Sequence, residues 1–177
     1  MPVATAYTTT SSSPVVRQQE TILAHLRKPI IILMADDDFE DRMLAQEALA
    51  HINMEHEVHT VSDGMALMDY LHRRGSFESF KNSPLPGLIL LDLYMPRMSG
   101  LDALREIKSD PLLRRIPTVI LTTSELEEHI QQSYDLGANS FIPKSVTYSS
   151  LAEKVEEIGK YWLEVVQLPP ETLPTRS

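Results

Sequence analysis

Short apolar or alternating runs and amphipathic stretches follow one another along most of the chain. The runs have the length of buried strands, and the stretches between them place apolar residues at steps of three and four, which is typical of helices. Strand–helix pairs in succession predict a doubly wound α/β fold, in which a five-stranded parallel sheet lies between two layers of helices. The predicted strands are residues 30–35, 56–61, 88–91, 117–121 and 140–142.

Polar residues at the starts of the amphipathic stretches indicate where helices begin. Asp38 comes directly before one stretch and is predicted to cap its helix. Ser124 and Glu127 have the spacing of a capping box, which predicts a helix that is capped by Ser124 and ends at Gly137. The last helix is predicted to include Trp162, because apolar residues recur there at helical spacing.

The two ends of the chain lack this alternation. Residues 1–28 begin with a stretch rich in Thr and Ser, which predicts a tail, and continue with one short amphipathic helix after Pro14. Residues 29–167 contain all five strand–helix pairs and are predicted to form one domain. Residues 168–177 are rich in proline and are predicted to form a C-terminal tail.

Composition narrows the classes of function. The chain has 16 Lys and Arg against 25 Asp and Glu, a formal net charge of −9, and such an acidic surface repels nucleic acid. The absence of cysteine excludes a disulfide framework and a thiol nucleophile. No apolar run approaches the ~18 residues that span a membrane, and no signal peptide is visible, so no membrane partner is expected and the expected location is the cytoplasm.

Chemically active side chains come directly after four of the predicted strands. Residues 36–38 are three aspartates after the first strand, Asp92 follows the third, Thr122 ends the fourth, and Lys144 follows the fifth. Carboxyl ends of parallel strands share one edge of a sheet, so these groups are expected to meet. Gathered carboxylates repel one another and favour a hard cation such as Mg²⁺. A carboxylate can also attack phosphorus, and Lys144 and Thr122 could then bind the phosphoryl oxygens.

This constellation resembles the receiver domain of two-component response regulators, over about residues 29–167. The resemblance implies a flavodoxin-like sheet with strand order 2-1-3-4-5 and a phosphoryl group that is accepted by Asp92. It also implies a Mg²⁺ ion whose ligands are Asp36, Asp37, Asp92 and the main-chain carbonyl of Tyr94.

The resemblance assigns the remaining site residues as well. Thr122 corresponds to the switch hydroxyl, Phe141 to the switch aromatic residue and Lys144 to the phosphate-binding lysine. Ser145 stands where many receivers have proline after this lysine, and a cis peptide is usual there in the family. Tyr94 and Ser124 occupy the positions that flank the path of the hydrolytic water, and neither is expected to activate it. Slow loss of the phosphoryl group is therefore expected.

Three further features narrow the resemblance to the stand-alone response regulators that are paired with cyanobacterial phytochromes. They are the long loop before the third strand, residues 142–145, and residues 161–169. The implied partners are a sensor histidine kinase of the phytochrome type, an unknown downstream protein and a second copy of the chain. The homodimer would form through the last strand and last helix, where Trp162 either reaches the interface or packs in the core.

Three alternatives compete with a phosphorylated receiver. Asp36 and Asp38 with Thr122 and Lys144 also resemble the haloacid-dehalogenase phosphatases, but the late pair of acids and the cap domain of that family are missing. A flavodoxin-like module would need a loop that binds the flavin phosphate, and three aspartates would repel it. A receiver that acts without phosphate would not need the chemical groups that are present. The expected protein is thus no enzyme beyond its own phosphorylation and dephosphorylation.

Overall fold

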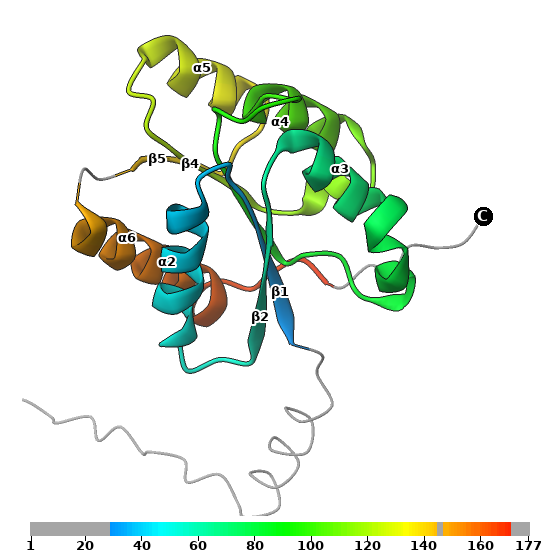
Figure 1. Cartoon of the computed structure of the whole chain (residues 1–177), viewed down its shortest axis with the longest axis horizontal. Helices are drawn as coiled ribbons and strands as arrows, with labels where there is room; N and C mark the ends of the chain where they lie inside the picture. The colour runs from blue at the N-terminus through cyan, green and yellow to red at the C-terminus, as the bar shows by residue number, and fades with distance from the viewer. Residues whose placement is uncertain (1–28, 145–146, 171–177) are drawn as a thin grey trace, which may run out of the picture.

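A five-stranded parallel sheet forms the centre of the molecule (Figure 1). The computed structural model describes residues 29–144 and 147–170; the helix predicted within residues 1–28 and the peptide bond before Ser145 lie outside these ranges. The strand order is β2-β1-β3-β4-β5, which confirms the order implied by the sequence resemblance. The strands are β1 (Ile30–Ala35), β2 (His56–Val61), β3 (Leu88–Leu91), β4 (Thr118–Thr122) and β5 (Ser140–Pro143).

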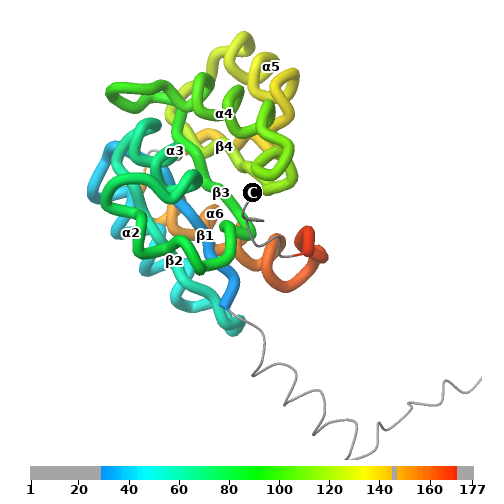
Figure 2. The backbone as a smooth tube through the Cα atoms, turned by 90° about the vertical axis from the view of Figure 1, so that its right-hand side faces the viewer, coloured from blue at the N-terminus to red at the C-terminus, as the bar shows by residue number. Residues whose placement is uncertain are grey.

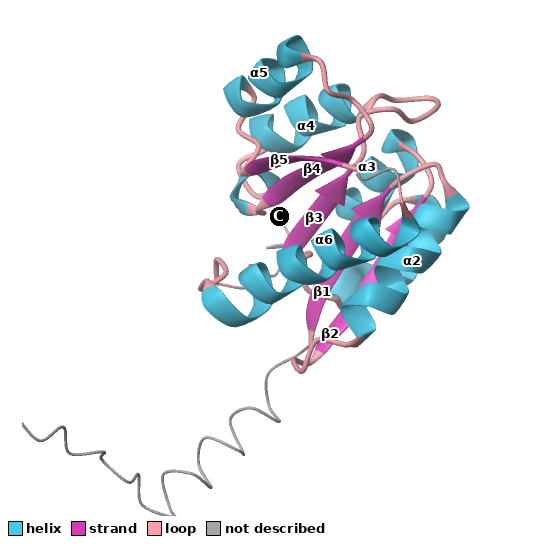
Figure 3. Cartoon of the chain, turned by 90° about the vertical axis from the view of Figure 1, so that its left-hand side faces the viewer, coloured by secondary structure: helices cyan, strands magenta, loops and turns pink. Residues whose placement is uncertain are grey.

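Helices cover both faces of the sheet, as the alternating pattern predicts. Two helices pack on one face and three on the other (Figures 1 and 3). Within the group of three, α4 and α5 lie side by side (Figures 1 and 2). The first face carries α2 (Phe39–Ala50) and α6 (Tyr148–Lys160), and the second carries α3 (Gly64–His72), α4 (Gly100–Ser109) and α5 (Glu127–Asp135).

Side chains of β1 alternate between two hydrophobic cores. Ile32 and Met34 pack with α2 and α6, whereas Leu33 and Ala35 pack with α3 and α4. All four are almost completely buried, because a central strand of a doubly covered sheet is enclosed on both faces. The continuous apolar run in the sequence is the direct consequence of this position.

The last helix ends differently from a regular α-helix. After Lys160, a five-residue π-helical segment, Tyr161–Val165, continues the chain. Within it Leu163 is buried, and Trp162 is half-buried against the core between α2, α6 and the sheet. Trp162 therefore packs on the domain itself, whereas Tyr161 and Val165 are exposed.

The long polar loop before β3 contains a 3₁₀-helix, Gly75–Asn82, that was not predicted from the sequence. Arg73 holds this region in place: its backbone is left-handed, with φ 58°, and its side chain is buried. The guanidinium donates hydrogen bonds to the carbonyls of Tyr70, at 2.9 Å, and Pro84, at 2.7 Å. One arginine thus connects the end of α3 with the entry into β3.

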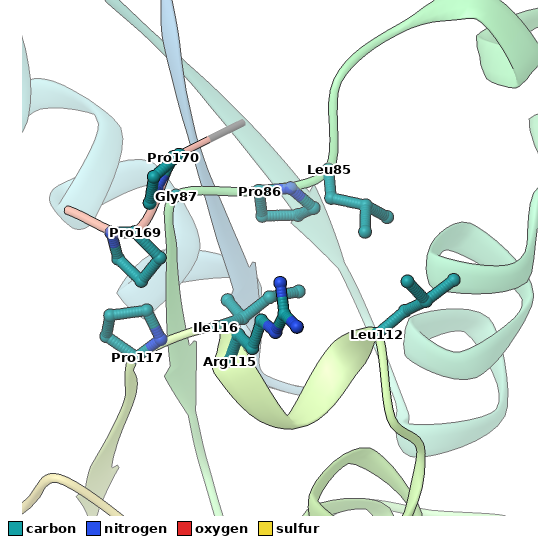
Figure 4. Close-up of a pocket in the computed structure, with 9 residues that line it drawn as sticks. All are labelled: Leu85, Pro86, Gly87, Leu112, Arg115, Ile116, Pro117, Pro169 and Pro170. Carbon is teal, nitrogen blue, oxygen red and sulfur yellow. The ribbon is translucent and has the colours of Figure 1, made fainter. Parts of the chain in front are cut away.

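A small pocket, lined mainly by apolar residues, lies at the end of the sheet where β3 and β4 begin (Figure 4). The described end of the chain contributes Pro169 and Pro170 to its wall, and Leu168 lies against Gly87. Its volume of about 40 Å³ is small beside the roughly 300–1,000 Å³ of ligand pockets. Among the described helices, none has the length and apolar character that crossing a membrane requires.

Candidate functional site

Three carboxylates meet where β1 and β3 end. Oxygen atoms of Asp36, Asp37 and Asp92 all lie within 4.8 Å of one another. The parallel register explains this, because the Asp92 N–H donates to the carbonyl of Ala35 at 2.9 Å and so aligns the two strand ends. Asp36 and Asp92 are buried, whereas Asp37 is exposed and forms the outer side of the cluster.

The ammonium of Lys144, which follows the edge strand β5, contacts two of these carboxylates and also Asp41. Its Nζ lies 2.7 Å from Asp36 Oδ2, 2.7 Å from Asp41 Oδ2 and 3.3 Å from Asp92 Oδ2. Lys144 follows β5, and its N–H donates to the carbonyl of Thr122 at 2.7 Å. The lysine is therefore positioned by the sheet and reaches across the end of β4 to the acidic cluster.

Burial and mutual charge set the ionisation of this cluster. Burial raises the pKa of the Asp36 carboxyl to about 6, although Lys144 opposes the shift. Burial lowers the pKa of the Lys144 ammonium, but the carboxylates around it outweigh this effect and hold that pKa above its usual value. Lys144 is therefore charged at neutral pH, and ionised Asp36 depends on positive charge nearby.

A divalent cation fits this set of oxygen atoms. The carboxylates of Asp36, Asp37 and Asp92 gather here, Asp41 lies beside them, and the Lys144 ammonium contacts three of these four groups, so their negative charge exceeds the positive charge of the lysine. The buried oxygen Asp36 Oδ2 is close to this ammonium but receives no aligned hydrogen bond from the part of the chain that the structure describes. Clustered carboxylate oxygens, one of them without an aligned hydrogen-bond donor, are suitable ligands for a hard cation.

The other residues predicted for the site lie around this cluster. Thr122 is buried at the end of β4, and its Oγ1 accepts the Ser124 N–H at 3.4 Å. The Tyr94 N–H donates to Asp92 Oδ1 at 3.3 Å. Phe141, on β5, packs its half-buried ring on the core between α3, α4 and the sheet. Asp36, Asp37 and Asp92 are thus gathered in one cluster that Lys144 contacts through Asp36 and Asp92, whereas Thr122, Tyr94 and Phe141 occupy neighbouring positions.

Asp38 caps α2, which confirms the prediction for this residue. Its carboxylate accepts the N–H groups of Glu40, at 2.8 Å, and Asp41, at 3.3 Å. Because these hydrogen bonds occupy the Asp38 carboxylate, Asp38 does not join the acidic cluster, to which the two preceding aspartates belong.

The prediction that Ser124 caps the next helix is wrong. α5 begins at Glu127, and its N-cap Leu126 contributes no side-chain hydrogen bond. The Ser124 hydroxyl instead lies 2.7 Å from Nδ1 of His129 and accepts the Leu126 N–H at 3.4 Å. The sequence spacing fits a capping box, but the chain is extended at Leu126, and the Ser124 hydroxyl is bonded to a side chain in the first turn of the helix.

Two contacts hold the loop between β3 and α4, which follows Asp92. The Gly100 N–H donates to the carbonyl of Leu93 at 2.9 Å. Arg97, left-handed with φ 65°, pairs with the buried carboxylate of Asp63. Burial alone would raise the pKa of Asp63, but the bonds from Arg97 and the α3 backbone outweigh it and lower this pKa.

Sequence reasoning missed two residues near the site, Asp41 and His129. Asp41 contacts Lys144, but an acidic residue in the first turn of a helix is already explained by the helix dipole. His129 contacts Ser124 and lies close to Tyr94, yet it is one of six histidines scattered along the sequence. Neither position shows a distinguishing pattern, because each contact depends on how the start of a helix lies against its neighbouring segments.

Comparisons with known proteins agree with this geometry. The family model of the response regulator receiver domain matches residues 32–156. Response regulator Rcp1 of Synechocystis sp. is 43% identical over 141 residues, which cover 80% of this chain and 94% of Rcp1. The crystal structure of the phosphorylated cyanobacterial phytochrome response regulator RcpA is 45% identical with a TM-score of 0.76, and covers 80% of this chain and 99% of RcpA. The Mn²⁺-bound form of Rcp1 has a TM-score of 0.75 at 42% identity, with coverage of 80% and 99%.

Proposed function

Because the chain belongs to the response regulator receiver family, we propose that Asp92 accepts a phosphoryl group from a sensor histidine kinase. The observation that carries this proposal is the meeting of three carboxylates with the Lys144 ammonium at one edge of the sheet. Asp92 belongs to this set, at the end of β3 and in contact with Lys144. The phosphorylated protein would then signal through contacts with other proteins.

The phosphoryl transfer uses groups that already lie side by side. A carboxylate oxygen of Asp92 attacks the phosphorus of the kinase phosphohistidine, the P–N bond breaks, and the imidazole nitrogen keeps the electron pair. Lys144 is fixed close enough to Asp92 to bind an oxygen of the transferred group. The charge of its ammonium offsets the negative charge that the phosphoryl oxygens bring into the cluster.

Receiver domains bind a divalent metal at this acidic pocket, and we propose Mg²⁺ for this chain. Asp36, Asp37 and Asp92 would hold the ion through carboxylate oxygens, with the Tyr94 carbonyl as a further ligand. When bound, the ion neutralises negative charge on the phosphoryl oxygens and on the carboxylates. The Mn²⁺-bound form of Rcp1, a similar protein, supports a divalent ion at this site.

Thr122 and Phe141 are proposed to transmit the phosphorylation. The Thr122 hydroxyl would donate a hydrogen bond to a phosphoryl oxygen on Asp92, which changes its present contact with the Ser124 N–H. Phe141 lies on β5 and pairs in register with Ile120 of β4, two residues before Thr122. A shift of the β4 end can therefore reach the Phe141 ring through adjacent strands.

The proposed kinase is of the phytochrome type, which the similarity to RcpA, a phytochrome response regulator, supports. We expect phosphotransfer from such a kinase, with Mg²⁺ present, to add one phosphoryl group to the chain. Excess chelator should lower the rate strongly, because the repelling carboxylates then lack their cation. Intact mass spectrometry measures both rates. Labelling that is undiminished in chelator would disprove the metal requirement, and transfer only from unrelated kinases would disprove the partner.

We further propose a homodimer through β5 and α6. Tyr148, Tyr161 and Val165 are exposed on α6 and the segment after it. The Phe141 N–H on β5 donates to the Tyr134 hydroxyl at 3.2 Å, so this donor is already occupied, and we propose that the exposed side chains make the contact. Sedimentation velocity at micromolar concentration should show a dimer that Val165→Asp weakens at least about tenfold. Leu126→Asp, at the start of α5, is the control. A wild-type monomer with and without phosphate would contradict the proposal.

A further inference from the structure

Three side chains from three different segments meet beside the carboxyl ends of β3 and β4. Nδ1 of His129, on α5, lies 2.7 Å from the hydroxyl of Ser124, in the loop after β4. The same nitrogen lies 3.5 Å from the hydroxyl of Tyr94, in the loop after β3. The Tyr94 and His129 rings are T-shaped, with centroids 5.8 Å apart and planes at 66°. The histidine thus contacts both loops that border the proposed phosphorylation site.

The cluster consists of two anchored residues and one exposed residue. Ser124 is buried, and its N–H donates to Thr122 Oγ1. His129 is half-buried on α5, where its carbonyl accepts the hydroxyl of Ser133 at 2.7 Å. Tyr94 is 50% exposed, and both its ring and its hydroxyl lie against His129. His129 is therefore placed to restrain the Tyr94 ring.

The Tyr94 side chain leads from the acidic cluster to α5. Its own N–H donates to Asp92 Oδ1, and its ring ends beside His129. We propose that His129 is a positioning residue that holds the Tyr94 ring across the approach to Asp92 and so prolongs the phosphorylated state. This inference rests on the proposed phosphorylation of Asp92 and adds a residue that determines its lifetime.

The hydrolysis that this arrangement slows has a defined geometry. Water attacks the phosphorus opposite the Asp92 oxygen, the bond between that oxygen and phosphorus breaks, and the Asp92 carboxylate and inorganic phosphate are released. The water must stand in line with the breaking bond, so a ring held in its path lowers the rate.

The test measures loss of the phosphoryl group separately from its uptake. The protein is labelled with acetyl phosphate and Mg²⁺, the donor is removed, and intact mass is followed over time. We expect His129→Ala to lose phosphate about fivefold faster, with unchanged uptake rate and melting temperature. Gln131→Ala, an exposed neighbour on the same helix, should behave like the wild type. A purely structural role of His129 would lower the melting temperature and leave the loss rate unchanged.

A double-mutant cycle then tests whether His129 acts through Tyr94. In Tyr94→Ala, the further change His129→Ala should have no effect on the loss rate, because the ring to be positioned is already gone. The proposal would be overturned if the effects of the two substitutions on the loss rate multiply in the double variant, or if His129→Ala loses phosphate at the wild-type rate. If His129→Ala does not fold, His129→Asn replaces it, with an expected rate between wild type and Tyr94→Ala. Failure of the proposed function itself would appear separately, as a wild-type protein that takes up no phosphate.

Discussion

Asp92→Asn is expected to abolish phosphorylation, with an uptake rate at least about 100-fold below that of the wild type. The amide is a poor nucleophile toward phosphorus, and it also removes one of the three carboxylates that would hold the cation. The side chain keeps its size, so the buried position at the end of β3 remains filled. Intact mass after incubation with acetyl phosphate and Mg²⁺ measures the result.

Asp38→Asn is the matched control for this experiment. It removes a carboxylate close to the cluster, but this side chain caps α2, and asparagine caps helices as well as aspartate does. Wild-type uptake is therefore expected in this variant. If Asp92→Asn gains a phosphoryl group as fast as Asp38→Asn, the phosphoacceptor is another residue.

Gly100→Ala is expected to destabilise the domain by about 3 kcal/mol. A Cβ at this position would overlap the Asp92 carbonyl oxygen and lie 2.7 Å from Leu93 Cα, and both are backbone atoms without rotational freedom. Either the start of α4 or the loop after Asp92 must move. The melting temperature should fall by roughly 6–12 °C, measured by circular dichroism.

Gly159→Ala separates this clash from the general effect of adding a methyl group. The atoms nearest to a Cβ at Gly159 belong to the side chains of Ile52 and Leu49, whose ends can rotate, and alanine favours the helix that contains this position. A smaller loss of stability is expected there. Equal losses in both variants would show that the close backbone contact at Gly100 has no special cost.

The sheet and the acidic cluster follow from local features of the sequence. Asp36 and Asp92 come directly after apolar runs, and the rule that parallel strands end at one edge is enough to bring them together. The role of Ser124 could not be predicted in this way. Whether its hydroxyl bonds to a backbone N–H of α5 or to the His129 side chain depends on where α5 lies. Arg73 is similar: its left-handed backbone and buried guanidinium follow from contacts with Pro84, eleven residues away in sequence.

The central position of β1 has a consequence during synthesis of the chain. β1 pairs with β3, about 50 residues later, so one edge of this apolar strand has no partner until residues 88–91 have been made. At roughly 5–20 residues per second, translation of the intervening segment takes about 3–10 s. During this interval the unpaired edge of β1 can associate with other nascent chains. Expression yield should therefore improve when translation is fast relative to aggregation or when chaperones protect the nascent strand.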